Sequence, residues 1–243
     1  MKCDICGGSL REEDLHCPDC GARYIRICSH CGQALPLGTE LCSACGGRGL
    51  PGLDMTREEM VAAGMHCFLP YSDDRVYDIY LGGNRDGGGH VFHNTVGYTG
   101  PALDRLVLPA AVEGRPIYGV WNEFFCLGDE FAPELYAQTY RRMLPIREVV
   151  LSHGIREAFT YAFFGCCGLE VLELPVSIKR MYYDFYDLFT DDAETRRNGW
   201  VKSPVTIRYR GSKEQWEKVT VTSRLWEYVE KGQIIMEYLN LDE

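Results

Sequence analysis

The chain has 243 residues, of which 46% are hydrophobic, and it carries a formal net charge of −10. Its length and apolar content suffice for one sizeable core, while an acidic balance without a basic cluster argues against binding to nucleic-acid phosphates. No apolar leader follows Met1 and no run of about 18 apolar residues occurs, so we expect a cytoplasmic protein with reduced thiols and no membrane partner.

The N-terminal segment holds eight of the twelve cysteines in four Cys-x-x-Cys-Gly units. Ten residues separate the two units of each pair, and the first pair maps onto the second by a shift of 25 residues. Each unit presents two sulfurs from one tight bend, and its glycine lets the backbone curl so that amides face the thiolates. Two units complete a tetrahedral shell, which predicts two zinc sites. The predicted ligands are Cys3, Cys6, Cys17 and Cys20 in one site, and Cys28, Cys31, Cys42 and Cys45 in the other.

A shell of four thiolates leaves no coordination position for water or substrate, so we expect both zinc ions to be structural. A disulfide framework would need an oxidising compartment, and a thioredoxin-like role would need one such motif within a βαβ unit. Ligation in sequence order closes only short loops, whereas an alternating arrangement closes longer ones at greater entropic cost. His16 and His30 lie beside ligands, and we expect them in solvated loops because each site already has four cysteines.

Residues 3–46 resemble a double zinc ribbon module, in which Cys-x-x-Cys-Gly units alternate with short hairpins. Such modules serve as protein adaptors or as nucleic-acid binders, and charge discriminates between the two roles. Residues 1–50 carry five basic and six acidic side chains, and each four-thiolate zinc site adds about two negative charges. The acidic character favours a protein partner, with nucleic-acid association as the alternative.

A glycine-rich segment follows the last cysteine pair. Gly46 to Gly52 contains four glycines and a proline, which is typical of a linker. We therefore expect a ribbon module at 1–46, a linker at 47–53 and a second domain at 54–243.

Local signals predict two further elements after the linker. Thr56 and Glu59 match a capping box, which predicts a short helix ending near residue 63. The glycine-rich stretch 82–89 lacks the residue order of phosphate-binding loops and lies between β-rich runs, so a flexible hairpin is expected there. His90 and His93 would face opposite sides of a strand, which argues against a metal site.

An apolar pattern recurs in the C-terminal half with a period of 23 residues. This length and an L-x-x-L-x-L core are typical of leucine-rich repeats, in which each repeat gives one strand that packs against its neighbours. An earlier copy lies 43 residues before, so an insertion is expected, with a helix at 129–143. The pattern predicts parallel strands at 106–108, 149–151 and 172–174.

These repeats resemble the BspA-like leucine-rich repeats, whose Ala-Phe-x-x-Cys-x-x-Leu unit matches residues 162–169. The likeness extends over about 94–219, with an opening repeat at 96–117 and a closing strand and short helix at 204–216. The resemblance implies a short solenoid of parallel strands with a few decorating helices. We therefore expect a mixed, mainly β fold that combines tandem zinc ribbons with a leucine-rich-repeat solenoid.

The remaining cysteines raise the question of catalysis. Cys166 with His153 as a base would make a thiol nucleophile, but closeness in sequence does not establish the geometry that activates a thiol. In the repeat pattern this cysteine is a small buried side chain, and we expect Cys67 and Cys126 to be packed in the same way. We expect no catalytic residue and no small-molecule substrate. The expected function is non-enzymatic binding of another protein through ribbon and solenoid surfaces, with a thiol enzyme as a further alternative.

Overall fold

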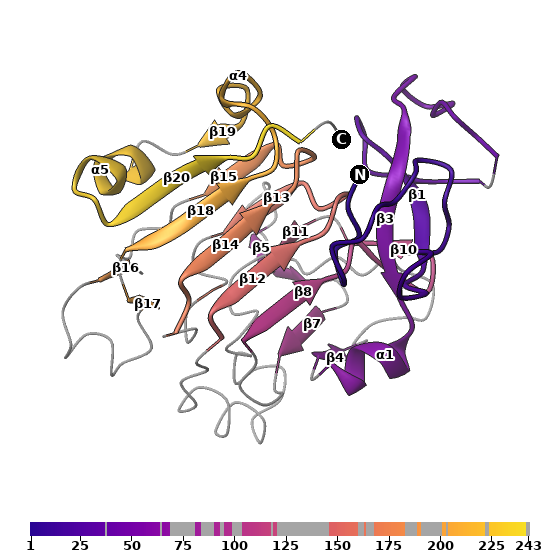
Figure 1. Cartoon of the computed structure of the whole chain (residues 1–243), viewed down its shortest axis with the longest axis horizontal. Helices are drawn as coiled ribbons and strands as arrows, with labels where there is room; N and C mark the ends of the chain where they lie inside the picture. The colour runs from indigo at the N-terminus through magenta and orange to yellow at the C-terminus, as the bar shows by residue number, and fades with distance from the viewer. Residues whose placement is uncertain are drawn as a thin grey trace.

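The structure is a computed structural model of the whole chain (Figure 1), and among the residues that it describes strands dominate and helices are few and short. The structure describes residues 1–36, 38–63, 65–68, 81–83, 90–92, 95–98, 104–117, 119–120, 146–159, 163, 168–182, 189–190, 201–202, 204–221 and 224–241.

The N-terminal region forms a five-stranded sheet with the order β10-β9-β3-β1-β2. Residues 49–53 of strand β3 pair antiparallel with β1, and residues 54–55 pair parallel with β9, while β1 and β9 each pair antiparallel with one further strand. The bounds are β1 Tyr24–Cys28, β2 Ala34–Leu35, β3 Gly49–Met55, β9 Ala111–Val112 and β10 Arg115–Pro116.

The 25-residue repeat in the sequence is also a repeat in the backbone. The bridge between Lys2 and Ser9 recurs as the pairing of Ile27 with Ala34, and the bridge between residues 16 and 23 recurs between residues 41 and 48. Each Cys-x-x-Cys unit ends in a glycine with φ between +71° and +78°, a conformation that strongly favours glycine. The predicted role of these glycines is confirmed.

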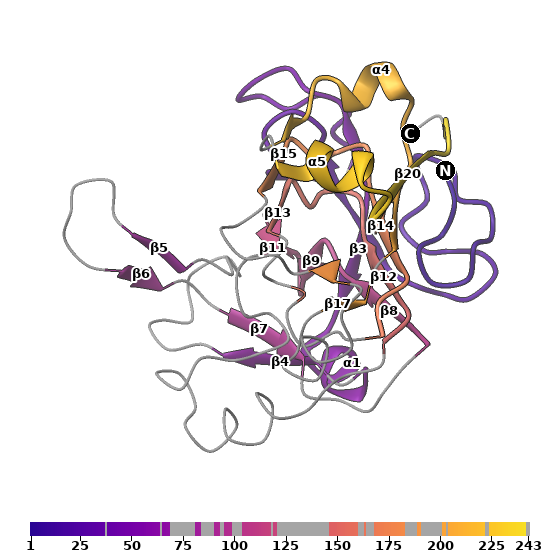
Figure 2. The same ribbon diagram turned by 90° about the vertical axis from the view of Figure 1, so that its left-hand side faces the viewer.

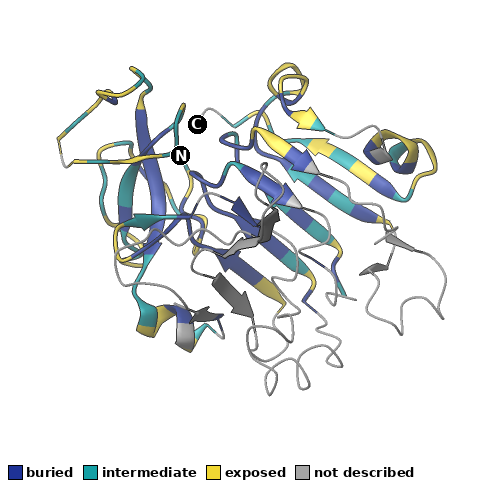
Figure 3. Cartoon of the chain, turned by 180° about the vertical axis from the view of Figure 1, so that it is seen from behind, coloured by how far each residue is buried: buried dark blue, intermediate teal, exposed yellow. Residues whose placement is uncertain are grey.

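The segment 47–53, expected to be a linker, contains most of strand β3 instead. Residues 49–54 are buried (Figure 3), and β3 is hydrogen bonded on both sides. The glycines of this segment permit close packing rather than flexibility: a side chain at Gly52 would lie 2.8 Å from the carbonyl oxygen of His153. The division of the chain into domains stays a prediction.

The predicted capping box is present at the start of α1 (Arg57–Ala62). The amide of Thr56 donates to the carboxylate of Glu59 at 2.7 Å, and the amide of Glu59 donates to Oγ1 of Thr56 at 3.1 Å. Two antiparallel pairs follow, and the second flanks the glycine-rich stretch, whose residues 84–89 lie outside the described residues. The pairs are β4 (Met65–Phe68) with β7 (Thr95–Tyr98), and β5 (Leu81–Gly83) with β6 (His90–Phe92).

A five-stranded, all-parallel sheet with the order β20-β18-β14-β12-β8 forms the larger part of the body. It contains the three predicted strands side by side, with Val149 opposite both Leu106 and Leu172, so this prediction is confirmed. Strand β20 was not predicted. The bounds are β8 Arg105–Leu108, β12 Glu148–Leu151, β14 Val171–Leu174, β18 Val205–Tyr209 and β20 Ile234–Tyr238.

A second parallel sheet, with the order β11-β13-β15-β19, forms another layer (Figure 2). Its strands alternate in the chain with those of the larger sheet, so successive passes contribute a strand to each layer. A short parallel pair of strands, β16 and β17, precedes β18. The bounds are β11 Gly119–Val120, β13 Glu157–Phe159, β15 Arg180–Tyr182, β16 Phe189–Thr190, β17 Val201–Lys202 and β19 Thr220–Val221.

The main core contains apolar side chains from both parallel sheets, including Leu151 and Leu174, both fully buried. Two helices near the C-terminus add to it, α4 (Lys213–Trp216) and α5 (Arg224–Glu230). The predicted strand followed by a short helix is present at 204–216, as β18 and α4. The buried Trp216 of α4 packs edge-on against the ring of Tyr209 of β18, with ring centroids 5.1 Å apart.

Several sequence predictions fall outside the described residues. These are the helix at 129–143, the side chain of Cys67, Cys126 and Cys166, and most of the Ala-Phe-x-x-Cys-x-x-Leu unit, of which Phe163 and Leu169 are described and buried. Within the described ranges, no helix combines the length and apolar character needed to cross a membrane.

Replacement of Leu172 by alanine tests the central strand of the larger sheet. Leu172 is fully buried in the main core, so Leu172→Ala should lower the free energy of unfolding by about 2–5 kcal/mol. Glu170→Ala is the control, because Glu170 precedes the same strand and is exposed. Denaturant unfolding measures both, and equal small effects would contradict the described core.

Candidate metal centres

The backbone of each Cys-x-x-Cys-Gly unit is held by the same two hydrogen bonds. In the first unit the amide of Gly7 donates to the carbonyl of Cys3 at 2.9 Å, and the amide of Cys3 donates to the carbonyl of Gly8 at 2.8 Å. Equivalent bonds recur in the other three units at 2.7–2.9 Å. Each turn therefore fixes its two sulfurs relative to the backbone before any metal is considered.

The eight sulfurs gather in two groups of four, in sequence order as expected. The first group is Cys3, Cys6, Cys17 and Cys20, the second is Cys28, Cys31, Cys42 and Cys45, and the four sulfurs of each group lie within 4.8 Å of one another.

The sulfur geometry fits a tetrahedral metal ion. Sulfur pairs from opposite units lie 3.5–3.6 Å apart in both groups. Zinc–sulfur bonds of about 2.3 Å in a tetrahedron place the sulfurs about 3.8 Å apart, close to this spacing. His16 and His30 are exposed and belong to neither group. Each cluster is thus a four-sulfur set that could hold one metal ion.

Two of the buried thiols, those of Cys3 and Cys28, receive hydrogen bonds that favour the thiolate. Burial raises the pKa of Cys28, but amide hydrogen bonds from Cys31 and His30 outweigh it and the pKa is lowered to about 6. Burial also raises the pKa of Cys3, yet hydrogen bonds led by that of the Tyr24 hydroxyl lower it to about 7. A thiolate is the form that binds metal, so both environments are suited to ligation.

Tyr24 links the first cluster to the surrounding protein. Its hydroxyl donates to Sγ of Cys3 at 3.3 Å and accepts from the amide of Asp4 at 2.9 Å. Burial and the nearby Asp4 carboxylate raise the pKa of this hydroxyl, which keeps it a proton donor. The second ribbon has Gly49 at the equivalent position, 25 residues later, so this contact is particular to the first cluster.

The first cluster lies against the outer face of the larger parallel sheet. Val107 and Val150 alternate with the inward-facing leucines of β8 and β12, and both pack in an apolar cluster with Cys3 and Cys17. Leu10, Tyr24 and Leu53 complete this second core. The first ribbon therefore covers the outer face of the larger sheet at β8 and β12.

Ion pairs fix the same contact. The side chains of Asp4 and Arg210 are almost fully buried, and Oδ1 of Asp4 lies 2.7 Å from Nη1 of Arg210. Nε of Arg210 also donates to Glu173 at 2.8 Å, and the guanidinium of Arg105 donates to the carbonyl oxygen of Asp4 at 2.9 Å. Residues 4 and 210 are thereby joined although they lie near opposite ends of the chain.

The sequence contains a signal for the contact between the first ribbon and the larger sheet, which the sequence analysis did not use. The runs Leu106-Val107-Leu108 and Val149-Val150-Leu151 are apolar at every position, which is typical of strands buried on both faces. By contrast, β14 places Glu173 between its core positions, and this outward-facing carboxylate pairs with Arg210 instead of packing against apolar side chains. The doubly apolar strands are those that the first ribbon covers.

The thiol-enzyme alternative receives no geometric test. His153 is described and 1% exposed, whereas Cys166 lies outside the described residues. Among the described residues, the groups with metal-ligand geometry are the two cysteine clusters.

Comparisons with known proteins returned no match: a scan against family models, a search of curated proteins and a search of solved structures were each negative. The two family resemblances therefore rest on sequence motifs. The four-cysteine clusters fit tandem zinc ribbons, and no family match supports the BspA-like resemblance.

Loss of the buried ion pair should destabilise the joint between the first ribbon and the sheet. In Arg210→Ala the Asp4 carboxylate stays buried without its partner, so we expect a loss of about 3–5 kcal/mol in the free energy of unfolding. The control is Arg147→Ala, whose pair with Glu170 is exposed and should contribute little. Equal effects in denaturant unfolding would show that the Asp4–Arg210 pair does not hold the joint.

Proposed function

We propose that this chain is a zinc-binding, non-enzymatic scaffold that binds another protein, with one structural zinc ion in each cluster. The observation that carries the proposal is that each site has four sulfurs, enough to fill the coordination shell of a tetrahedral metal ion. The first set also packs against the larger sheet. A closed shell supplies cross-links between distant backbone segments rather than a site for substrate.

The chemistry of the ligands supports zinc as the metal. Four thiolates in a tetrahedral arrangement suit zinc, a borderline-soft ion without redox activity of its own, and the tandem ribbon pattern is typical of structural zinc. Bound zinc would supply folding free energy to a segment with few apolar side chains. Because such thiolates persist where thiols stay reduced, we place the protein in the cytoplasm.

The alternation of strands between two parallel layers supports a short leucine-rich-repeat solenoid. Successive passes add one strand to the larger sheet and one to the smaller, and neighbouring strands bury their inner faces against each other. The BspA-like character of the repeats remains part of this proposal. Solenoids of this kind present extended surfaces that suit recognition of other proteins.

Exposed apolar side chains mark surfaces where a partner would bind. Trp226 on α5 and Ile235 on β20 are both more than two-fifths exposed on the body, and Leu41 is exposed on the second ribbon. Tryptophan is enriched among the residues that carry most of the binding energy at protein interfaces, which makes Trp226 the strongest of these candidates. No described feature specifically favours the nucleic-acid or thiol-enzyme alternative.

Metal content tests the first part of the proposal. The purified protein should hold about two zinc ions per chain, and Cys17→Ser should hold about one, because each ribbon closes its own site. Cys42→Ser is the matched variant in the second cluster. Elemental analysis of metal and protein measures this, and loss of both ions from either variant would contradict two independent sites.

Affinity capture from the native host tests the second part. The full-length chain is the right bait, since removing residues 1–50 would cut into β3 and uncover Val107 and Val150. A specific protein lost with Ile235→Asp but kept with Leu41→Asp would assign binding to the body, and the reverse would assign it to the ribbon.

The control variant Lys218→Glu changes an exposed charge without removing an apolar side chain. The proposal fails if no protein is enriched over the control bait, or if the chain turns over a small molecule and Cys166→Ser abolishes that turnover.

A further inference from the structure

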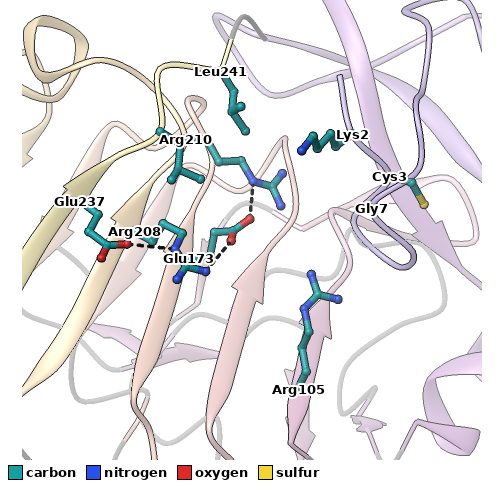
Figure 4. A pocket seen from close by; sticks show the side chains of 10 residues that line it. Lys2, Cys3, Gly7, Arg105, Glu173, Arg208, Arg210, Glu237 and Leu241 are labelled. Carbon is teal, nitrogen blue, oxygen red and sulfur yellow. Dashed lines mark hydrogen bonds and ion pairs between the residues drawn. The ribbon is translucent and has the colours of Figure 1, made fainter.

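A cavity of about 550 Å³ lies between the first ribbon and the outer face of the larger parallel sheet (Figure 4). The ribbon supplies Lys2, Cys3 and Gly7, while β8, β14, β18 and β20 supply charged side chains. Leu239 and Leu241, which follow β20, give the cavity an apolar wall. Its volume is in the range of about 300–1,000 Å³ that ligand sites occupy.

The charge of the lining is opposite in sign to that of the whole chain. Four cationic side chains line the cavity, and two carboxylates do so, in a protein of net charge −10. In Figure 4, Lys2, Arg105 and Arg210 surround the side of the cavity next to the ribbon. The carboxylates lie on the sheet: Glu173 borders Arg208 and Arg210, and Glu237 borders Arg208. Lys2 and Arg105 therefore form a cationic end of the cavity that neither of these carboxylates neutralises, whereas Arg208 and Arg210 are paired with them.

Existing ion pairs leave donors available at the cationic end. Arg105 uses Nε for Glu148 and Nη1 for carbonyl oxygens, and no hydrogen bond of its Nη2 is found among the described residues. Lys2 is exposed and forms no ion pair within the described part of the chain. A guanidinium has five N–H donors and an ammonium three, so both side chains retain capacity for an oxyanion.

Lys2 is not explained by the architecture of the metal site. The 25-residue repeat places the buried Ile27 at the equivalent position of the second ribbon, which has an equivalent backbone pairing and its own four-sulfur group. An apolar residue thus satisfies the ribbon fold at this position. The lysine is particular to the ribbon that faces the cavity.

We propose that this cavity binds a carboxylate-bearing peptide segment of a partner protein. The carboxylate would lie between Lys2 and Arg105, and a neighbouring apolar side chain would pack on Leu239 and Leu241. The inference rests on the proposed function, because the peptide belongs to a protein partner. The assay below uses purified components, so failed peptide binding and failed capture from the host are separate results.

Titration calorimetry with the full-length, zinc-loaded protein tests the proposal. The probe is the acetylated and amidated peptide Gly-Leu-Asp-Glu-Leu-Gly, compared with its Asn-Gln counterpart and with citrate as a small carboxylate. We expect the acidic peptide to bind with a Kd below about 1 mM and its amide counterpart at least about tenfold more weakly. Citrate binding as tightly as the peptide would overturn the peptide assignment in favour of a small carboxylate ligand.

Lys2→Glu should weaken peptide binding at least about tenfold, whereas Lys218→Glu, which alters an exposed lysine outside the cavity lining, should leave it unchanged. The metal content of Lys2→Glu should match that of the unmodified protein. Absence of peptide binding, equal binding by both variants, or loss of metal from Lys2→Glu would each overturn the proposal. The last result would assign the lysine to the metal cluster instead.

Discussion

Strand β3 is hydrogen bonded on both edges, and the position of both cysteine clusters depends on this double pairing. One edge of β3 pairs with β1, whose last residue is Cys28. The C-terminal end of β3 pairs on the other edge with β9, the next strand in the chain after β8 of the larger sheet. A strand held in this way cannot move without loss of backbone hydrogen bonds on one side. The ribbons are therefore fixed to the parallel sheets by strand pairing rather than connected to them by a flexible segment. The first ribbon, which has few apolar side chains of its own, obtains a core by covering Val107 and Val150.

The sequence predicted the features that depend on short, regular spacings. Cys-x-x-Cys-Gly has one tight backbone solution, so the order of the sulfurs and the positive φ of the following glycines could be read directly. The 23-residue recurrence likewise predicted that Val149 and Leu172 lie side by side in parallel strands. Thr56 and Glu59 predicted a helix start because a capping box is a local contact. In each case the interacting residues are near in sequence or related by a constant period.

The features that the sequence analysis missed depend on contacts between distant residues. Glycine and proline in 47–53 indicate a flexible linker by composition, but Gly52 is needed where backbone from residue 153 approaches β3. The pairing of Asp4 with Arg210 has no local signature, because each residue alone is typical of an exposed surface. The strands of the second parallel sheet have only two or three residues, too few for a hydrophobic period to be detected. The cavity was missed for the same reason, because residues that are distant in sequence form its walls.

The two ribbons and the parallel sheets form one structure joined at β3. Hydrogen exchange at the joint tests it most directly, because the amides of Asp54, Ala110 and Glu113 donate to the carbonyls of Arg23, Leu53 and Met55. Our account predicts slow exchange at these three amides in the zinc-loaded chain. Removal of metal with a chelator should make that exchange fast while β14 stays protected. Exchange at the rate of an unstructured segment in the zinc-loaded chain would contradict the account.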